Sequence, residues 1–366
     1  MFLKFFKKRS NIFFVSLVFI SALFEILFRI SESFSEFYCI NVFPVVKMIY
    51  LPANLIPFAF SESIIIALIL LAVIFFVMGI IKMFFAFFKK QAFPFFAKIL
   101  AGVMRLGVIV LFLFSLTFSA SYHRKPLSEL ASINVGEITL ESLEKATEYA
   151  AKKLWEISEQ IEYRPEQMSH SGMTFNELSL AVKEDVDKAC KEYTFLTKSR
   201  IKAKPIALSV PMTYTHISGI YTFFTGEPCI NTNYAQYSLP FTIAHEYSHQ
   251  IGIAPENETD FMAFLILSES KSPYLKYSAW SEAFLILSNE LYLQNPDSYR
   301  KIVLNLPPLA ITDYTVSSGV YSKYSNSAAG EIAKKANDTY LKANGVESGV
   351  NSYSESVILL VSYLTK

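Results

Sequence analysis

The stretch Ile243-Ala244-His245-Glu246-Tyr247-Ser248-His249-Gln250-Ile251-Gly252 contains an HExxH motif, and we predict that the second part of the chain folds around it. On a helix, residues four apart share a face, so His245 and His249 can direct two imidazoles at one metal ion. Glu246 reaches the same side, where it can accept a proton from a water on that ion. The arrangement is typical of zinc metallopeptidases and predicts Zn²⁺ as the cofactor.

The residues around the motif predict a buried helix. Pro240 suits a first helical position, and Gly252 lies where a C-terminal cap belongs. Between them, Phe241, Ile243 and Ala244 supply apolar packing. A chance HExxH match would tend to fall on an exposed helix or in a loop, so this context favours a metal site.

A third metal ligand is expected just after the motif. Gly252 ends the first helix, and Pro255 is well placed to begin the next. In the ExxxD pattern of Glu256 and Asp260, the glutamate is the third ligand and the aspartate holds a ligating histidine through its second ring N–H. Glu258 is the alternative ligand, and either glutamate could instead act on the helix dipole. We favour Glu256, because only Glu256 has the matching aspartate.

Other polar residues are weaker candidates for the site. His216 lies in a predicted strand region, from which it could approach the site as an electrophile. Tyr321 or Tyr324, in a predicted loop, could stabilise an oxyanion, although nothing in the sequence distinguishes them from ordinary surface tyrosines. We expect His123 and His170 at the surface.

Composition predicts a membrane protein. Of the 366 residues, 52% are hydrophobic, and the chain contains 33 phenylalanines. This is too apolar for an ordinary soluble enzyme, and the excess lies in the first third of the chain. The formal net charge of +1 gives no indication of a nucleic-acid partner. We therefore expect membrane lipid as a partner and no nucleic acid.

Three membrane spans are predicted, at about residues 11–30, 64–85 and 99–120. Each is an apolar run long enough to cross a bilayer as a helix. The first follows a basic amino terminus but lacks a cleavage site, so we interpret it as an anchor rather than a signal peptide. The three spans make residues 1–122 a membrane domain.

The connection between the first two spans is predicted to be an interfacial loop. Residues 31–63 are aromatic and contain three prolines, which makes this segment too broken to span a bilayer. Glu25 and Arg29, one helical turn apart near the end of the first span, can pair or extend toward the bilayer surface. We interpret both as structural residues.

Basic residues predict the orientation. Lysines and arginines accumulate at the amino terminus and in the connection 82–98, whereas the connection 31–63 has only Lys47. The positive-inside rule then places the amino terminus in the cytoplasm and everything after Tyr122 outside it. The relevant basic residues are Lys4, Lys7, Lys8, Arg9, Lys82, Lys89, Lys90 and Lys98.

Residues 123–366 have the composition of a soluble domain large enough for one core. The periodicity predicts helices over residues 137–163, 174–197, 275–293, 327–344 and 353–364, with strands between residues 205 and 231. The predicted class is therefore α+β, a helix-rich zincin-like domain after three transmembrane helices. The strand before the metal helix could offer its edge to an extended peptide, or simply cover the helix.

The three cysteines show no metal-binding or redox spacing. Outside the cytoplasm, a disulfide between Cys190 and Cys229 is conceivable. Two buried free thiols are an equally acceptable interpretation.

The chain resembles an uncharacterised family of bacterial membrane proteins, a domain of unknown function with an HExxH motif of the zinc-peptidase kind. The resemblance extends from the first span to the last helix. It rests on residues 122–127, 225–227, 239–242, 245–250, 256–261, 337–342 and 349–353.

The resemblance implies a few spans plus a zincin-like domain, without a substrate. The family pattern usually has Asn where this chain has Asp260, which brings the chain closer to the gluzincin ExxxD arrangement. The spacing between His249 and Glu256 is shorter than in typical gluzincins, so the choice between Glu256 and Glu258 stays open.

Two functions are consistent with the sequence. The first is a membrane-anchored zinc metallopeptidase that hydrolyses peptide bonds of a peptide or protein substrate, with Glu246 as general base. The second is a catalytically silent membrane sensor or scaffold, whose zincin-like domain binds a metal ion or a peptide. The sequence does not indicate substrate, cleavage specificity or oligomeric state.

Overall fold

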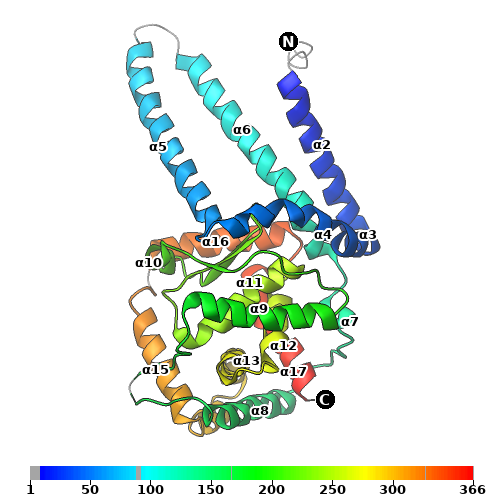
Figure 1. Cartoon of the computed structure of the whole chain (residues 1–366), viewed down its shortest axis with the longest axis vertical. Coiled ribbons are helices and arrows are strands. Elements are labelled where there is room, and N and C mark those ends of the chain that lie inside the picture. The colour runs from blue at the N-terminus through cyan, green and yellow to red at the C-terminus, as the bar shows by residue number, and fades with distance from the viewer. Residues whose placement is uncertain (1–8, 88–91, 166, 326, 366) are drawn as a thin grey trace.

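In the computed structural model, three long helices stand on a helix-rich domain with a small sheet (Figure 1). The structure describes residues 9–87, 92–165, 167–325 and 327–365. An α+β class is therefore confirmed. The lysines Lys4, Lys7, Lys8, Lys89 and Lys90, which contribute to the predicted orientation, lie outside the described residues.

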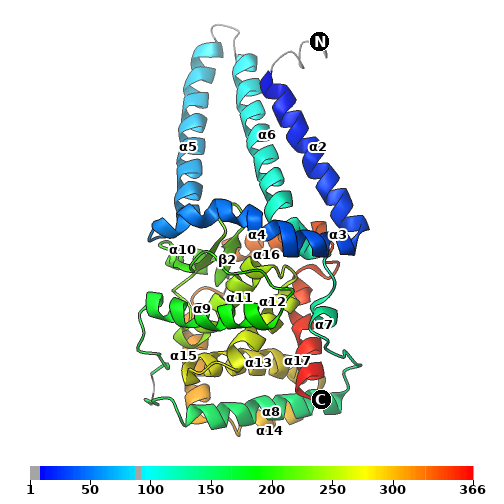
Figure 2. The same ribbon diagram turned by 45° about the vertical axis from the view of Figure 1, so that its right-hand side comes forward.

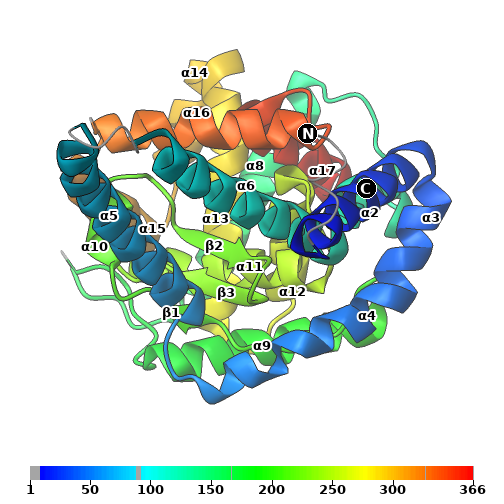
Figure 3. The same cartoon turned by 90° about the horizontal axis from the view of Figure 1, so that it is seen from above.

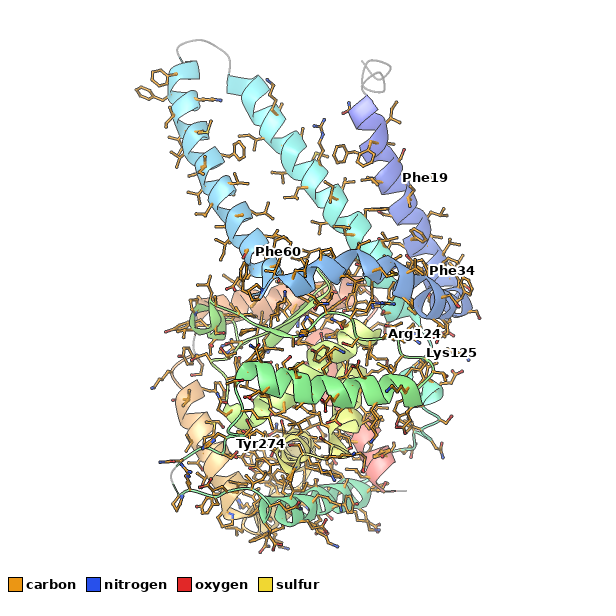
Figure 4. The ribbon with its side chains drawn as sticks, viewed as in Figure 1. Phe19, Phe34, Phe60, Arg124, Lys125 and Tyr274 are labelled. Atoms are coloured by element: carbon orange, nitrogen blue, oxygen red, sulfur yellow. The ribbon has the colours of Figure 1, made fainter. Side chains whose placement is uncertain are left out.

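The three standing helices are α2 (Arg9–Ile30), α5 (Phe60–Phe87) and α6 (Ala92–Thr117). Their apolar stretches Asn11–Ile30, Phe60–Lys82 and Ala97–Thr117 have mean hydropathies of 2.2, 3.4 and 2.4, and each is long enough to cross a membrane. Their side chains face outward, as the labelled Phe19 illustrates (Figure 4). The three predicted spans thus correspond to three helices able to span a bilayer.

The connection between α2 and α5 is helical, so the prediction of a loop is wrong. It consists of the consecutive segments α3 (Glu32–Phe37), the π-helix η1 (Tyr38–Val42), α4 (Phe43–Val46) and the 3₁₀ helix η2 (Lys47–Leu55). Changes of helix type accommodate the prolines, with Pro44 in the first turn of α4 and Pro52 inside η2. Glu32–Leu55 is also long and apolar enough to span, with mean hydropathy 1.2, but it lies crosswise to the three standing helices (Figures 1 and 2).

Glu25 and Arg29 do not pair with each other, as the sequence allowed, but with other elements. The Glu25 carboxylate accepts hydrogen bonds from the hydroxyls of Ser115 and Ser119, at 2.7 and 2.9 Å. The Arg29 guanidinium donates to the carbonyl of Ala343, at 2.7 Å. These partners are available because α2 packs along α6, so the two residues join distant parts of the chain.

The domain core is built from five long helices. Their bounds are α8 Leu140–Ser158, α9 Phe175–Glu192, α11 Leu239–Ile251, α12 Glu256–Ser268 and α13 Pro273–Gln294. Capping boxes at Thr139 and Thr174 fix the starts of α8 and α9. The apolar faces of all five helices meet in one buried cluster.

Shorter or peripheral helices complete the domain. They are η3 Ser119–His123, α7 Leu127–Leu130, α10 Ser209–Thr213, η4 Gln236–Ser238, α14 Pro296–Val303, α15 Pro308–Tyr321, α16 Ala328–Ala343, η5 Gly349–Glu355 and α17 Ser356–Leu364. Helix α16 lies at the end of the domain nearest the standing helices, whereas α8 and α14 lie at the opposite end (Figures 1 and 2).

The sheet has three short strands, β1 (Lys204–Pro205), β2 (Gly219–Thr222) and β3 (Glu227–Ile230). Strand β3 is central, parallel to β1 and antiparallel to β2. The predicted strand region is confirmed, and β2 lies at an edge of the sheet.

Buried polar contacts join the segments next to the standing helices to the domain. Arg124 pairs through two nitrogens with the Glu36 carboxylate of α3, at 2.7 and 2.9 Å, and also donates to the carbonyls of Phe195 and Gly252. The side chain of Lys47 in η2 is buried and donates to the carbonyl of Gln250, at 2.7 Å. Arg124 lies at this junction in Figure 4. The helix that carries the HExxH motif is therefore held directly by residues that flank the spans.

The cysteines are all free thiols. Cys229 is buried and lies 3.2 Å from the Ser61 hydroxyl, whereas the Cys190 thiol faces the carbonyl of Thr197. The disulfide between Cys190 and Cys229 that the sequence permitted is absent.

Candidate metal centre

The HExxH motif lies on the central helix α11, which is buried on almost every side. Pro240 occupies its first turn, as the sequence predicts. Gly252 ends it with φ +112°, a backbone conformation that favours glycine, and the N–H groups of Gly252 and Ile253 bond back to the carbonyls of His249 and Ser248. This tight turn brings the start of α12 back beside the motif.

Three potential ligand atoms meet at this turn. The Nε2 atoms of His245 and His249 lie 3.1 and 3.5 Å from Oε2 of Glu256, in the first turn of α12. Among the described residues, these three form the one group of histidine, cysteine and acidic side chains with a geometry able to hold a metal ion. Glu256 and His249 are buried, and His245 is nearly so.

The outer nitrogen of each imidazole has its own partner. Nδ1 of His245 lies 2.8 Å from Oδ1 of Asp260, whose other oxygen accepts a hydrogen bond from Ser356 of α17. Nδ1 of His249 lies 2.9 Å from the carbonyl of Ile253. When Nδ1 carries the proton that these acceptors bind, Nε2 presents its lone pair toward Glu256.

The two distances from Glu256 fit a tetrahedral ion. Ligands about 2.0–2.1 Å from zinc at tetrahedral angles are separated by roughly 3.3 Å. The distances of 3.1 and 3.5 Å from Glu256 to the two histidines bracket this value. Two imidazoles and one carboxylate also match the donor set of catalytic zinc sites, which leave a fourth position open. The residues present therefore fit a zinc ion.

Hydrogen bonds and charges within this group shift the pKa values of His245 and Glu256. Burial alone would lower the pKa of His245, but hydrogen bonds to Asp260 and Glu256 outweigh it and raise that pKa well above its usual 6.5. Burial would likewise raise the pKa of Glu256, yet the charges and hydrogen bonds of His249 and His245 hold it below the usual range. Glu256 is thus an ionised carboxylate at neutral pH, as a metal ligand must be.

Glu246 lies beside this group, under strand β2. A Cβ atom built on Gly219 would come within 2.6 Å of Oε1 of Glu246, so only glycine allows the strand to approach so closely. Burial raises the pKa of Glu246 to about 7, although His245 and His249 oppose that rise. Its Oε2 is buried and has no hydrogen-bond partner in the described structure. A carboxyl with this pKa is suited to exchange protons near neutral pH.

The structure separates the two candidate third ligands. Glu256 lies with the histidines, whereas the Glu258 carboxylate accepts a hydrogen bond from the backbone N–H of Leu127, at 2.8 Å. Burial raises the pKa of Glu258 to about 7, against the effects of Leu127 and the Arg124 charge. Glu258 therefore anchors the segment that follows the last span.

His216 and the two tyrosines lie elsewhere. A Cβ on Gly330 would collide with the His216 ring, which places His216 at the start of α16, and His216 is not part of the metal-type group. The hydroxyl of Tyr321 accepts the N–H of Ala235, and that of Tyr324 accepts the side-chain amide of Asn233. Tyr321 is the last residue of α15, so the prediction that it lies in a loop is wrong.

The two histidines expected at the surface differ in their exposure. His170 is exposed, which confirms the prediction. His123, at the end of η3, is half-buried, and its Nε2 is enclosed with no partner among the described residues. His123 follows the last span directly, where η3 packs under α2 and α3 rather than leading away into solvent.

Several site residues could not be recognised from the sequence. The buried amide of Gln250 accepts from Ser199 and Arg200 and donates to the carbonyls of Ile201 and Gly226, which fixes α11 to the sheet region. Tyr340 of α16 lies near Glu256. Burial raises the pKa of the Tyr340 hydroxyl, and the charge of Glu256 raises it further. No motif marks these positions, because their partners are distant in sequence.

Two aromatic rings cover the His249 imidazole. The ring of Phe118, next to the end of α6, lies 5.9 Å from that of His249, and the ring of Tyr221 in β2 lies 6.4 Å away. The Tyr221 hydroxyl is buried and has no hydrogen-bond partner in the described structure. These two rings thus cover the His249 imidazole on the side of α6 and β2.

Fold and site together define a helix-rich α+β protein, with apolar helices able to span a membrane and a His–His–Glu group able to hold a metal ion. The chain belongs to the family described as "Protein of unknown function (DUF3810)", which matches residues 38–361. No curated protein and no solved structure matches the chain. The predicted membership of an uncharacterised family is therefore confirmed.

Proposed function

We propose that this protein is a membrane-anchored, zinc-dependent metallopeptidase with a zincin-like domain. The observation that carries the proposal is the spacing of the three ligand atoms, 3.1 and 3.5 Å, with both outer imidazole nitrogens bound to acceptors. His245, His249 and Glu256 would hold the ion, and Asp260 would orient His245. Bound zinc supplies a Lewis acid that polarises a peptide carbonyl and lowers the pKa of a coordinated water.

The chain's own groups then move the proton. Glu246 accepts a proton from the attacking water, whose oxygen forms a bond to the carbonyl carbon as the C–N bond breaks. The same carboxyl delivers that proton to the leaving amine, which departs neutral. Its pKa of about 7 and its unpartnered Oε2 support this two-way role.

The free edge of β2 is suited to align a peptide. The Ser218 carbonyl accepts the Asn231 N–H of the neighbouring chain segment, so alternation turns the backbone groups of Gly219 and Tyr221 to the outer edge of β2, which no strand of the described residues covers. The backbone of Tyr221 lowers the pKa of the Glu246 carboxyl, so this edge lies beside the proposed general base. An extended substrate added to this edge would run past Glu246.

We propose that the domain lies outside the cytoplasm, with the amino terminus in the cytoplasm. The lysines of the amino terminus and of the 82–98 connection support this orientation. A cysteine-accessibility or protease-protection assay on intact cells tests it, independently of any activity.

Metal analysis of the full chain in nanodiscs tests the site. We expect one zinc per chain, loss of zinc in Glu256→Ala and His245→Ala, and full zinc in Glu258→Gln, which keeps the acceptor for Leu127. Glu256→Gln and Glu258→Gln are matched, isosteric changes one half-turn apart on α12. Equal zinc in both would refute the ligand assignment.

Turnover distinguishes a peptidase from the silent sensor or scaffold. Glu246→Gln should keep zinc and lose hydrolysis of a quenched-fluorescent peptide library, by a factor of about 10² to 10⁴. Zinc binding by the wild-type chain with no cleavage of soluble or membrane-anchored peptides would favour the sensor.

A further inference from the structure

The candidate metal centre lies at the end of the domain that faces the membrane. Phe118, whose ring is 5.9 Å from that of His249, directly follows Thr117, the last residue of the apolar stretch of α6. The tip of the β2–β3 hairpin is tied to the same level, since the Phe223 carbonyl accepts hydrogen bonds from Thr117 and Tyr50. The histidines therefore lie just beneath the bilayer surface if α6 spans it.

One side of the space above the site is closed by aromatic residues, between α6 and α16. Phe114 of α6 lies 6.0 Å from the ring of Tyr340, and the hydroxyls of Tyr122 and Tyr340 are 3.2 Å apart. These contacts join α6 and η3 to α16 beside Glu256. A substrate would not approach between α6 and α16.

Another side of this space faces helix α5. Seen from above, β2 lies in the area bordered by α5, α6 and α16 (Figure 3). From Ile65 to Met78 the side chains of α5 are exposed all around the helix, including its side toward α6. Along residues 65–78, side chains of the described residues thus do not fill the space between α5 and α6. In a membrane this space is open to the bilayer.

We propose that the polypeptide bound at this site is anchored in the same membrane, and that its juxtamembrane segment passes between α5 and α6 to the free edge of β2. Cleavage of that segment rests on the proposed peptidase function, whereas its binding does not. Ile220, whose side chain is 43% exposed on β2, would lie against the bound segment.

The geometry limits where the segment would be bound. An extended chain advances about 3.3 Å per residue. A polypeptide that leaves the bilayer level with Thr117 would need roughly three to six residues, ~10–20 Å, to reach the histidines. The bound residues should therefore fall within about ten positions of the end of the substrate's own span.

Photo-crosslinking in nanodiscs or vesicles tests the binding step. The full chain with Glu246→Gln carries benzoylphenylalanine at Ile220 or, as a control, at Leu304, which is 81% exposed just after α14 at the opposite end of the domain. The probe is a single leucine–alanine span followed by a 30-residue tail of randomised sequence. The same tail without the span is the second probe.

We expect the Ile220 position to crosslink the anchored probe at least tenfold more than the free tail, within ten residues of the span. The Leu304 position should crosslink neither, which separates specific binding from mere concentration at the membrane. Equal crosslinking of the free tail, or contacts spread along the whole tail, would overturn the proposal.

Cleavage of the same probes by the wild-type chain separates the two proposals. Crosslinking as expected without cleavage would leave the binding site intact and refute the peptidase. Cleavage of free and anchored tails at equal rates, with no preference for Ile220 over Leu304, would leave the peptidase intact and refute membrane-anchored substrates.

Discussion

Replacing Gly219 by alanine should displace the general base without disturbing the metal ligands. The new Cβ would lie 2.6, 2.8 and 3.0 Å from Oε1, Cγ and Cδ of Glu246, closer than any ordinary contact. The carboxylate must retreat by about 0.8 Å to restore ordinary van der Waals separation. Because Gly219 does not have a positive φ, alanine brings no backbone strain of its own.

A displacement of this size should lower the catalytic rate strongly and the free energy of unfolding only moderately. A misplacement of about 1 Å can cost about 10²-fold in rate, which is ~2.7 kcal/mol of activation free energy. Overpacking costs roughly 1–3 kcal/mol of stability, partly offset by the lower entropy of the unfolded alanine chain. Gly219→Ala should therefore stay folded and keep zinc while losing about 99% of kcat/KM.

The assay compares Gly219→Ala with Gly136→Ala, where the added Cβ would meet nothing within 4 Å. Each full-length variant in nanodiscs is measured for zinc content, melting temperature with and without chelator, and hydrolysis of a peptide that the wild type cleaves. Retention of activity within threefold in zinc-loaded Gly219→Ala would refute the displacement argument. Loss of zinc in this variant would refute it as well, since the Cβ would then have disturbed the ligands.

Three further outcomes are expected. Asp260→Ala, which leaves Nδ1 of His245 without its 2.8 Å partner, should weaken zinc affinity about 10- to 100-fold in a competition titration. Arg124→Lys, which cannot reproduce the two-nitrogen pairing with Glu36, should lower the melting temperature, with ~2–4 kcal/mol lost in unfolding free energy. Burial raises the pKa of Glu282 to about 8, and the charge of Asp260 raises it further. Above about pH 4.3 the folded state therefore keeps a proton that the unfolded state has released. The free energy of unfolding falls as the pH rises from about 4.3 to 8. Glu282→Gln should therefore melt higher than wild type at pH 8 and alike at pH 4, and a constant difference would contradict this.

Helix α11 was predictable because its information is local. Pro240, the HExxH spacing and Gly252 act within one helix and its cap, and a turn of a few residues brings Glu256 back to it. The choice between Glu256 and Glu258 required the structure, because it depends on Leu127, 131 residues away, as the partner of Glu258. The helical form of residues 31–55 was missed because prolines end α-helices, whereas π and 3₁₀ segments let this chain continue past them.

The side chains that cover the site could not be predicted from the sequence, for a related reason. Tyr340, Phe118 and Lys47 reach α11 or Glu256 from elements about 80 to 200 residues away, and each lies in a stretch whose composition indicates only a helix. Nothing in their local sequence distinguishes them from neighbours that face lipid or solvent. Such contacts follow from how the elements pack, which periodicity does not determine.

These contacts also decide how the protein divides into parts. The change in composition places a boundary near residue 122, but hydrogen bonds cross it. Lys47 donates to the carbonyl of Gln250 in the last turn of α11, and the Glu227 carboxylate of β3 accepts the N–H groups of Phe60 and Ser61. Removal of the membrane segment would leave these groups to water and uncover the His249 imidazole that Phe118 shields. Because a candidate metal site depends on the groups around its ligands for their orientation, the segments next to the standing helices belong to the site itself, and the proposed chemistry is properly measured in the full chain.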